Sequence, residues 1–238
     1  MAGPRRHRLV LFVLLLLLAL LLLVPQRGSA SAEEAEKVSL ELYYESLCPY
    51  CSRFIVNRLA GIFEDGLIDA VELRLVPYGN ARVGSNNEIT CQHGPYECLL
   101  NTVEACAIDA WPDLAMHFSF IYCVEDLVVK GQYKEWEYCF QKLGFDPKPI
   151  TECYKSEQGH KLELKYAKET DALEPPHQYV PWDYENFEAY ICKAYKGTPP
   201  KACEGLGQLQ TAEARNGVSY NSGSIELATA EGEGKEGA

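Results

Sequence analysis

The sequence contains no Asn-x-Ser/Thr motif and has few basic residues for its length. Without that motif, an N-linked glycan and sorting by a glycan tag are excluded. The 22 lysines and arginines are outnumbered by 34 aspartates and glutamates, which gives a formal net charge of −12. Such an acidic surface repels phosphate backbones and anionic headgroups. We therefore expect neither nucleic acid nor an anionic membrane surface as a partner.

The sequence has a single long apolar run and lacks a second one. This run covers residues 9–24, after Arg5, Arg6 and Arg8 and before the small residues Gly28 to Ala32. Positive charge, apolar run and small residues, in that order, are typical of a secretory signal peptide, which we place at residues 1–30. A membrane anchor is the alternative, but the run is shorter than the ~20 residues that a spanning helix needs. We predict a secreted chain with no membrane segment after signal cleavage.

The remaining sequence predicts one α/β domain. After a short polar leader (31–37), residues 38–44 alternate as a β-strand does, residues 54–63 have helical spacing, and residues 71–78 alternate again. This order predicts a βαβ unit. We place the domain at 38–203, with a helical insertion at about 85–170 that disulfides would hold together, and we interpret 204–238 as a disordered acidic tail.

Ten cysteines in a secreted chain indicate an oxidising compartment and several disulfides. Cys48 and Cys51 form a C-x-x-C motif, and the other eight cysteines allow 105 pairings. Short separations make Cys91–Cys98 and Cys192–Cys203 plausible local pairs, as hypotheses only.

The C-x-x-C motif lies between a predicted strand and a predicted helix. A thiol at a helix N-terminus ionises more readily, because the helix dipole and the backbone N–H groups of the first turn stabilise its thiolate. Cys48 could then attack a disulfide, and Cys51, one turn later, could resolve the mixed disulfide without any cofactor. By analogy with the Pro-Tyr dipeptide of glutaredoxins, we expect a potential of roughly −200 to −230 mV.

Two other interpretations of this motif are weaker. Zinc would need further ligands, such as Cys91, His93 and Cys98, and an oxidising compartment disfavours free thiolates. A structural Cys48–Cys51 disulfide would close too small a loop to stabilise the fold much. We therefore expect a redox-active dithiol.

A second motif, CQHGPYECLLNTVEAC at residues 91–106, resembles the CQHGxxECxxNxxEAC signature of the gamma interferon inducible lysosomal thiol reductase family. The segments VPYGNA (76–81) and TDALEPPHQYVPW (170–182) are similar to family segments in the same order. The resemblance implies a thioredoxin-like fold and reduction of protein or small-molecule disulfides with an external thiol reductant. It also implies a secretory route to the lysosome, the vacuole or the outside of the cell. The site residues that we expect are catalytic Cys48 and Cys51 and substrate-binding Pro49, Tyr50, Val180 and Pro181.

One departure from a thioredoxin-like core follows Trp182. The core β-hairpin expected before the last helix is missing, because Trp182 continues directly into Asp183-Tyr184-Glu185. We therefore expect a sheet that lacks one edge. Two alternatives to a reductase follow: a non-catalytic, disulfide-rich secreted binding protein, or a disulfide oxidase or isomerase. For His93, we expect a hydrogen bond that fixes its loop, rather than acid–base catalysis.

Overall fold

A computed structural model describes residues 35–174, 176, 186–206, 219–221 and 224–227 of the 238-residue chain. The elements in chain order are β1 (Val38–Tyr44), α2 (Pro49–Phe54), the π-helical turn η1 (Ile55–Leu59), α3 (Gly61–Glu64), η2 (Leu67–Ala70), β2 (Val71–Pro77), β3 (Arg82–Val83), β4 (Ile89–Thr90), α4 (Pro95–Ala110), α5 (Leu114–Val129), η3 (Tyr133–Glu135), α6 (Tyr138–Leu143), α7 (Lys148–Tyr154), α8 (Glu157–Asp171), α9 (Phe187–Ala194), η4 (Lys201–Cys203), β5 (Ser219–Asn221) and β6 (Ser224–Leu227).

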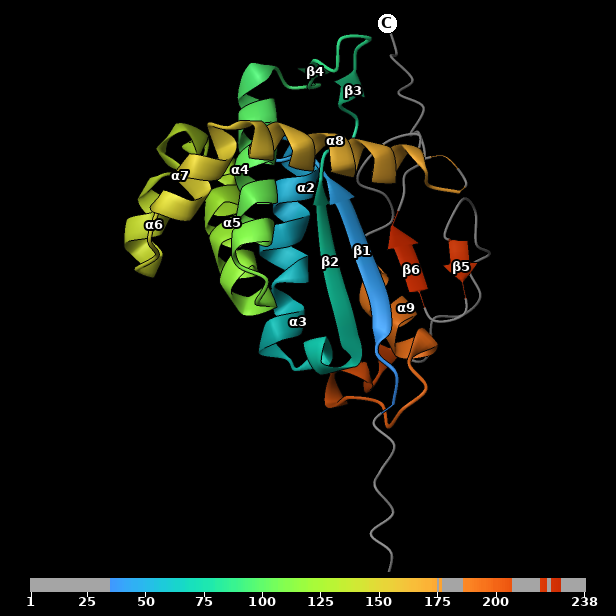
Figure 1. Cartoon of the computed structure of the whole chain (residues 1–238). Helices are drawn as coiled ribbons and strands as arrows, with labels where there is room; N and C mark the ends of the chain where they lie inside the picture. Colours follow the sequence, from blue (N-terminus) through green and yellow to red (C-terminus); the bar gives the residue numbers. More distant parts are fainter. Residues whose placement is uncertain (1–34, 175, 177–185, 207–218, 222–223, 228–238) are drawn as a thin grey trace, which may run out of the picture. The chain divides into compact units, whose positions relative to one another are not determined.

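The main sheet has the strand order β2-β1-β6-β5 (Figure 1). β1 pairs in parallel with β2 on one side, with Val38 opposite Val71, and with β6 on the other. Alternate side chains of β1 point to opposite faces of the sheet, and all seven are buried or partly buried. The predicted βαβ unit and the α/β class are therefore confirmed, and the dithiol motif follows the carboxyl end of the central strand.

The predicted tail contains two of these strands, so its interpretation as wholly disordered was wrong. β6 pairs in parallel with β1, and β5 runs antiparallel to β6. The short runs SYN and SIEL flank Ser222-Gly223, which is a hairpin signal that the acidic, glycine-rich composition around it obscures. The sheet has a strand on each side of β1, because β6 pairs with the backbone groups of β1 that β2 leaves free. Residues 183–185, where we expected the hairpin to be missing, lie outside the described residues, as do the signal peptide and the leader up to residue 34.

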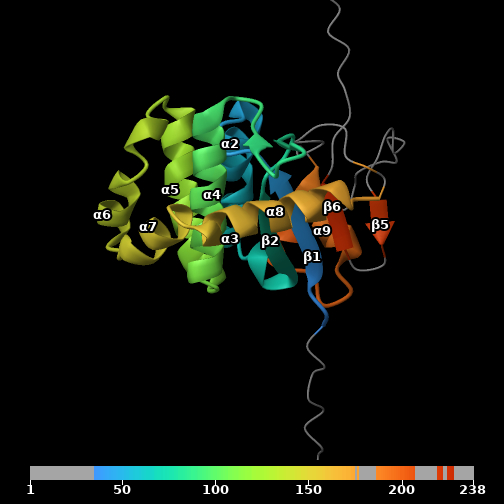
Figure 2. The same ribbon diagram turned by 45° about the horizontal axis from the view of Figure 1, so that its top comes forward.

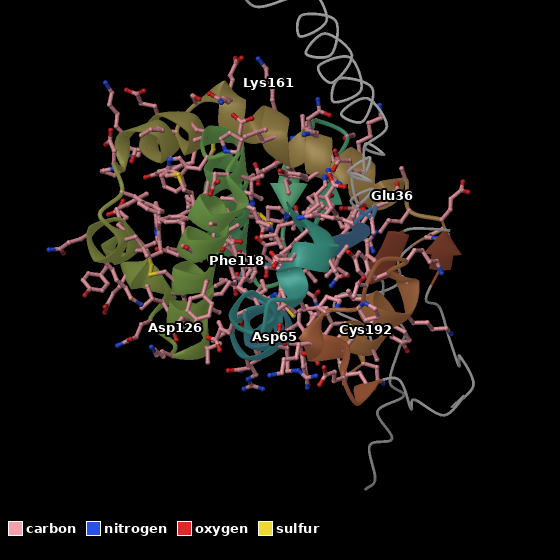
Figure 3. The ribbon with its side chains drawn as sticks, turned by 90° about the horizontal axis from the view of Figure 1, so that it is seen from below. Glu36, Asp65, Phe118, Asp126, Lys161 and Cys192 are labelled. Carbon is pink, nitrogen blue, oxygen red and sulfur yellow. A yellow bond between two sulfur atoms is a disulfide. The ribbon has the colours of Figure 1, made fainter. Side chains whose placement is uncertain are left out.

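Helices lie on both faces of the sheet. α8 crosses one face, where its Glu169 pairs with Arg74 of β2, and α9 lies behind the strands in the same view (Figure 2). On the α9 side, Phe187 packs edge-on against Phe54 of α2 with ring centroids 5.1 Å apart. Phe118 of α5 stacks on Phe63 at 4.2 Å and so joins the helical segment to the core (Figure 3). No helix among the described residues is long and apolar enough to cross a membrane.

Four disulfides tie the chain together. Cys91–Cys98 and Cys192–Cys203 confirm the two pairs proposed from their spacing, and Cys106–Cys153 and Cys123–Cys139 are the other two. The four cysteines of the last two pairs are at most 3 % exposed and lie in a hydrophobic core that α4 to α7 share. Cys98, Cys192 and Cys203 are only partly buried.

Removing the Cys106–Cys153 disulfide should cost the most stability of the four. Its cysteines are 47 residues apart, against 16 or fewer in the other pairs. A cross-link over a loop of that length stabilises by roughly 4 kcal/mol, mainly because it restricts the unfolded chain. We expect the double variant Cys106→Ser/Cys153→Ser to melt well below the wild type, and below the matched variant Cys123→Ser/Cys139→Ser. Equal melting of the two variants would contradict this ranking.

Candidate active site

The two thiols lie at the start of α2, shortly after the end of β1. Cys48 is the N-cap of α2 and has an extended backbone, with φ −69° and ψ 119°. Pro49 occupies the first turn, where its missing N–H costs no hydrogen bond. The Ser52 hydroxyl and N–H both donate to the Cys48 carbonyl, each at 3.0 Å. Sequence reasoning thus placed the motif correctly.

The environment favours the Cys48 thiolate. A hydrogen bond from the Cys51 thiol is the largest cause that lowers the pKa of Cys48, to about 7. The backbone N–H groups of Cys51 and Tyr50 and the nearby His93 lower it further, while burial opposes them. Cys48 is 1 % exposed, so these donors act in a site from which water is largely excluded.

Cys51 has the opposite character. It is fully buried, and burial raises its pKa well above the usual value, helped by its hydrogen bond to Cys48. The two thiols therefore have different roles. Cys48 ionises first, whereas Cys51 stays protonated and donates a hydrogen bond to the Cys48 sulfur.

The residues of the CQHG signature hold the loop that carries the thiols. The Tyr44 hydroxyl donates to Glu104 at 2.6 Å, and the Ser46 N–H donates to the side chain of Asn101 at 3.0 Å. The Ser46 hydroxyl donates to the Glu97 carbonyl at 3.2 Å. These contacts join the loop after β1 to α4, so the signature acts from the helical segment on the geometry of the dithiol.

His93 lies beside two buried carboxyl groups. Its Nδ1 is 2.5 Å from Glu97 and 3.6 Å from Glu45, both of whose side chains are fully buried. Its backbone N–H also donates to Glu97, which agrees with the expected loop-fixing role. Because burial raises the pKa of Glu45 to about 8, this carboxyl is protonated below that pH and adds no negative charge beside the Cys48 thiolate.

The structure contradicts the alternative of a zinc site that Cys91, His93 and Cys98 would complete. Cys91 and Cys98 form a disulfide and so offer no thiolate. Glu45, His93 and Glu97 have ligand atoms within 4.8 Å of one another. In the structure, His93 Nδ1 and the Glu97 side chain in this cluster are joined by a direct hydrogen bond.

A second pair of carboxyls lies deeper, where sequence reasoning expected only a helical core. Glu104 of α4 and Glu125 of α5 are both 0 % exposed. Burial raises the pKa of Glu104 to about 8, and burial with the neighbouring Glu104 raises the pKa of Glu125 well above the usual value. Glu104 is a signature residue, which is the one signal that could have marked it; nothing in the local sequence marks Glu125.

The other expected site residues divide into two groups. Pro49 and Tyr50 are exposed beside Cys48, with Tyr50 55 % exposed. Val180 and Pro181 lie outside the described residues. Sequence reasoning missed a cavity of about 410 Å³ between the start of α2 and the end of α5, which we call the side cavity; Pro49 and Val129 both line it.

Comparison with known proteins gives a consistent result. The family model for gamma interferon inducible lysosomal thiol reductase matches residues 39–143. The chain is 42 % identical to a gamma-interferon-responsive lysosomal thiol protein of Arabidopsis thaliana, over 77 % of this chain and 83 % of that one. It is 38 % identical to the gamma-interferon-inducible lysosomal thiol reductase of Mus musculus, over 71 % and 73 % of the two chains. The protein in Carassius auratus with the same name is 36 % identical, over 76 % and 78 %. This chain belongs to the gamma interferon inducible lysosomal thiol reductase family.

Proposed function

We propose that this chain is a disulfide reductase that acts on proteins or small disulfides through Cys48 and Cys51. The observation that carries the proposal is the pair of reduced thiols, Cys48 and Cys51, in the first turn at the start of α2. Their contact agrees with this role, because it lowers the pKa of Cys48, and burial together with this contact raises that of Cys51. The names of the relatives, thiol reductases in mouse and Carassius auratus, support the same activity.

The reaction follows from this arrangement. The Cys48 thiolate attacks one sulfur of the substrate disulfide; that bond breaks, and the leaving sulfur takes up a proton. Cys51 then loses its proton and attacks the Cys48 sulfur, which releases the second substrate thiol. The chain is left with a Cys48–Cys51 disulfide, and an external dithiol returns two electrons and two protons to it.

A thioredoxin-like arrangement remains our proposal for the fold. It is supported by the β1–α2–β2 unit with the dithiol at the carboxyl end of β1, where the chemistry of open α/β sheets usually lies. Val180 and Pro181 are proposed to contact the substrate chain beside Cys48. We also propose a secretory route that ends in the lysosome, the vacuole or the outside of the cell.

Turnover tests the function. With a dithiol reductant present, the native chain should accelerate insulin reduction at pH 5 and at pH 7, measured by precipitation of the released B chain. A rate equal to that of the reductant alone at both pH values would remove the proposal and favour a non-catalytic binding protein. A reduction potential near that of strong oxidants, about −120 mV, would instead favour a disulfide oxidase.

A further inference from the structure

The side cavity lies directly beside the dithiol. On one side it is lined by Leu47, Pro49, Ser52 and Arg53, and by His93 of the signature motif. Leu47 and Pro49 are the chain neighbours of Cys48, and Pro49, Ser52 and Arg53 share one face of α2 because they are three and four residues apart. An extended polypeptide advances about 3.3 Å per residue. When a substrate disulfide has reached Cys48, the side chains one or two residues from that cystine therefore lie close to this cavity.

The opposite wall comes from the helical segment and is held in place. Val128 and Val129 end α5, and Gly131 follows with φ +72°. The Gln132 N–H donates to Leu127 at 2.7 Å and the Gly131 N–H donates to Val128 at 2.9 Å, which is the Schellman arrangement of a helix end. This end of α5 lies near the labelled Asp126 (Figure 3).

The same wall continues with Tyr133. Its ring packs edge-on against Tyr96 of α4, with centroids 5.2 Å apart. Both sides of the cavity are thus formed before any substrate arrives, so ordering them costs little binding energy.

The chemistry of the lining differs from that of the chain as a whole. Leu47, Pro49, Val128, Val129 and Tyr133 give it apolar surface, and no acidic residue lines it, although acids outnumber bases 34 to 22 in the sequence. Arg53 is exposed at its edge and forms no ion pair with any residue that the structure describes. Val129 is 41 % exposed and adds an accessible apolar side chain to this lining.

We infer that the side cavity is a substrate subsite, which takes a bulky apolar side chain within two residues of the cystine of an extended polypeptide. This inference rests on the proposed reductase function and adds the substrate class: unfolded or loosely folded chains with a leucine or an aromatic residue near their cystine. Its lining by Leu47 and Pro49, the chain neighbours of Cys48, and its volume of about 410 Å³, enough for one such side chain, commit the site to this occupant. Arg53 further favours an acidic over a basic neighbour in the substrate.

The test uses cystine peptides that differ at a single position. Leucine or alanine is placed at each of the four positions within two residues of the cystine, and kcat/KM is measured for each peptide. At the favoured position, the wild type should prefer leucine over alanine about tenfold, within the range in which an apolar pocket discriminates. The ratio is taken within one enzyme, so the fraction of folded protein cancels.

Val129→Glu should bring this ratio close to one. Met116→Glu is the matched control, because Met116 lies on the same helix, is 39 % exposed and is not part of the cavity; it should keep the wild-type ratio. In a second measurement, Arg53→Glu should reverse the preference for a glutamate over a lysine beside the leucine.

Each result decides between the two proposals. Reduction of all peptides at the same kcat/KM overturns the subsite and leaves the reductase function intact. Loss of selectivity in Met116→Glu to the same extent as in Val129→Glu also overturns the subsite. Failure of the wild type to reduce any of the peptides or a small disulfide overturns both.

Discussion

Serine in place of Cys48 should abolish disulfide reduction by this chain. A hydroxyl at the start of α2 does not ionise at physiological pH, so the attacking group is lost while the shape of the site is kept. We expect the rate of insulin reduction to fall by roughly a thousandfold or more, to that of the reductant alone. Serine in place of Cys51 should instead stop the reaction after the first step, because the resolving thiol is gone. Mass spectrometry should then find the substrate attached to Cys48.

A matched pair of variants isolates the cause of the Cys48 reactivity. Alkylation of Cys48 by iodoacetamide should be half-maximal near pH 7 in the wild type, in line with the pKa of about 7. Cys51→Ala removes the hydrogen bond that lowers this pKa most, so its alkylation profile should move to higher pH. Cys51→Ser keeps a donor and should move less. An unchanged profile in Cys51→Ala would contradict the role given to that hydrogen bond, and a Cys48→Ser variant that still turns over would contradict the mechanism.

The domain should be most stable in acid and lose stability as the pH rises from 5 to 8. Burial raises the pKa of Glu45 and of Glu104 from 4.5 to about 8, and that of Glu125 well above its usual value. Between pH ~4.5 and ~8 the folded state binds more protons than the unfolded state. The stabilisation from these protonated carboxyls is therefore complete below pH ~4.5 and is lost as they ionise in the folded state.

The groups that face these carboxyls come from several elements. Glu104 accepts a hydrogen bond from Tyr44 of β1 and lies next to Glu125 of α5, and Glu125 also experiences the charges of Cys48 and Glu97. A single carboxyl with such a shift costs on the order of 3 kcal/mol between pH 5 and 8. For a domain of this size that corresponds to a fall in Tm of roughly 10 °C.

Thermal melts at pH 5, 6, 7 and 8 measure this slope. Glu125→Gln replaces one titrating carboxyl by a neutral group of the same shape and should flatten the curve, chiefly by raising Tm at pH 8. Glu137→Gln is the control, since Glu137 is exposed and should leave the slope as it is. A Tm that is constant or rises from pH 5 to 8, or a Glu125→Gln curve parallel to that of the wild type, would show that these carboxyls do not govern stability.

The sequence predicted the parts of the site whose pattern is local. β1, the helix start at Cys48 and β2 follow from alternation, the C-x-x-C position and proline, and two disulfides follow from short separations. The signature motif indicated the family before the structure gave its residues a role.

What it could not predict depends on contacts between distant segments. Glu125 is an ordinary polar position until α5 packs on α4 and encloses it beside Glu104. The side cavity exists only because the Schellman end of α5 lies against the start of α2. β6 pairs with a strand from the other end of the domain, and the composition of its surroundings concealed it.

The burial of the structural cystines bears on how a reductase survives its own working conditions. An external dithiol that recharges Cys48 and Cys51 can also attack any cystine that it can reach, and access limits the rate of that exchange. Cys106–Cys153 and Cys123–Cys139 are enclosed by the helices and are sheltered from it, whereas Cys91–Cys98 and Cys192–Cys203 lie closer to solvent. During prolonged exposure to reductant, the disulfides of the signature loop and of the last helix should therefore be reduced first. The two disulfides within the bundle of α4 to α7 should be reduced last.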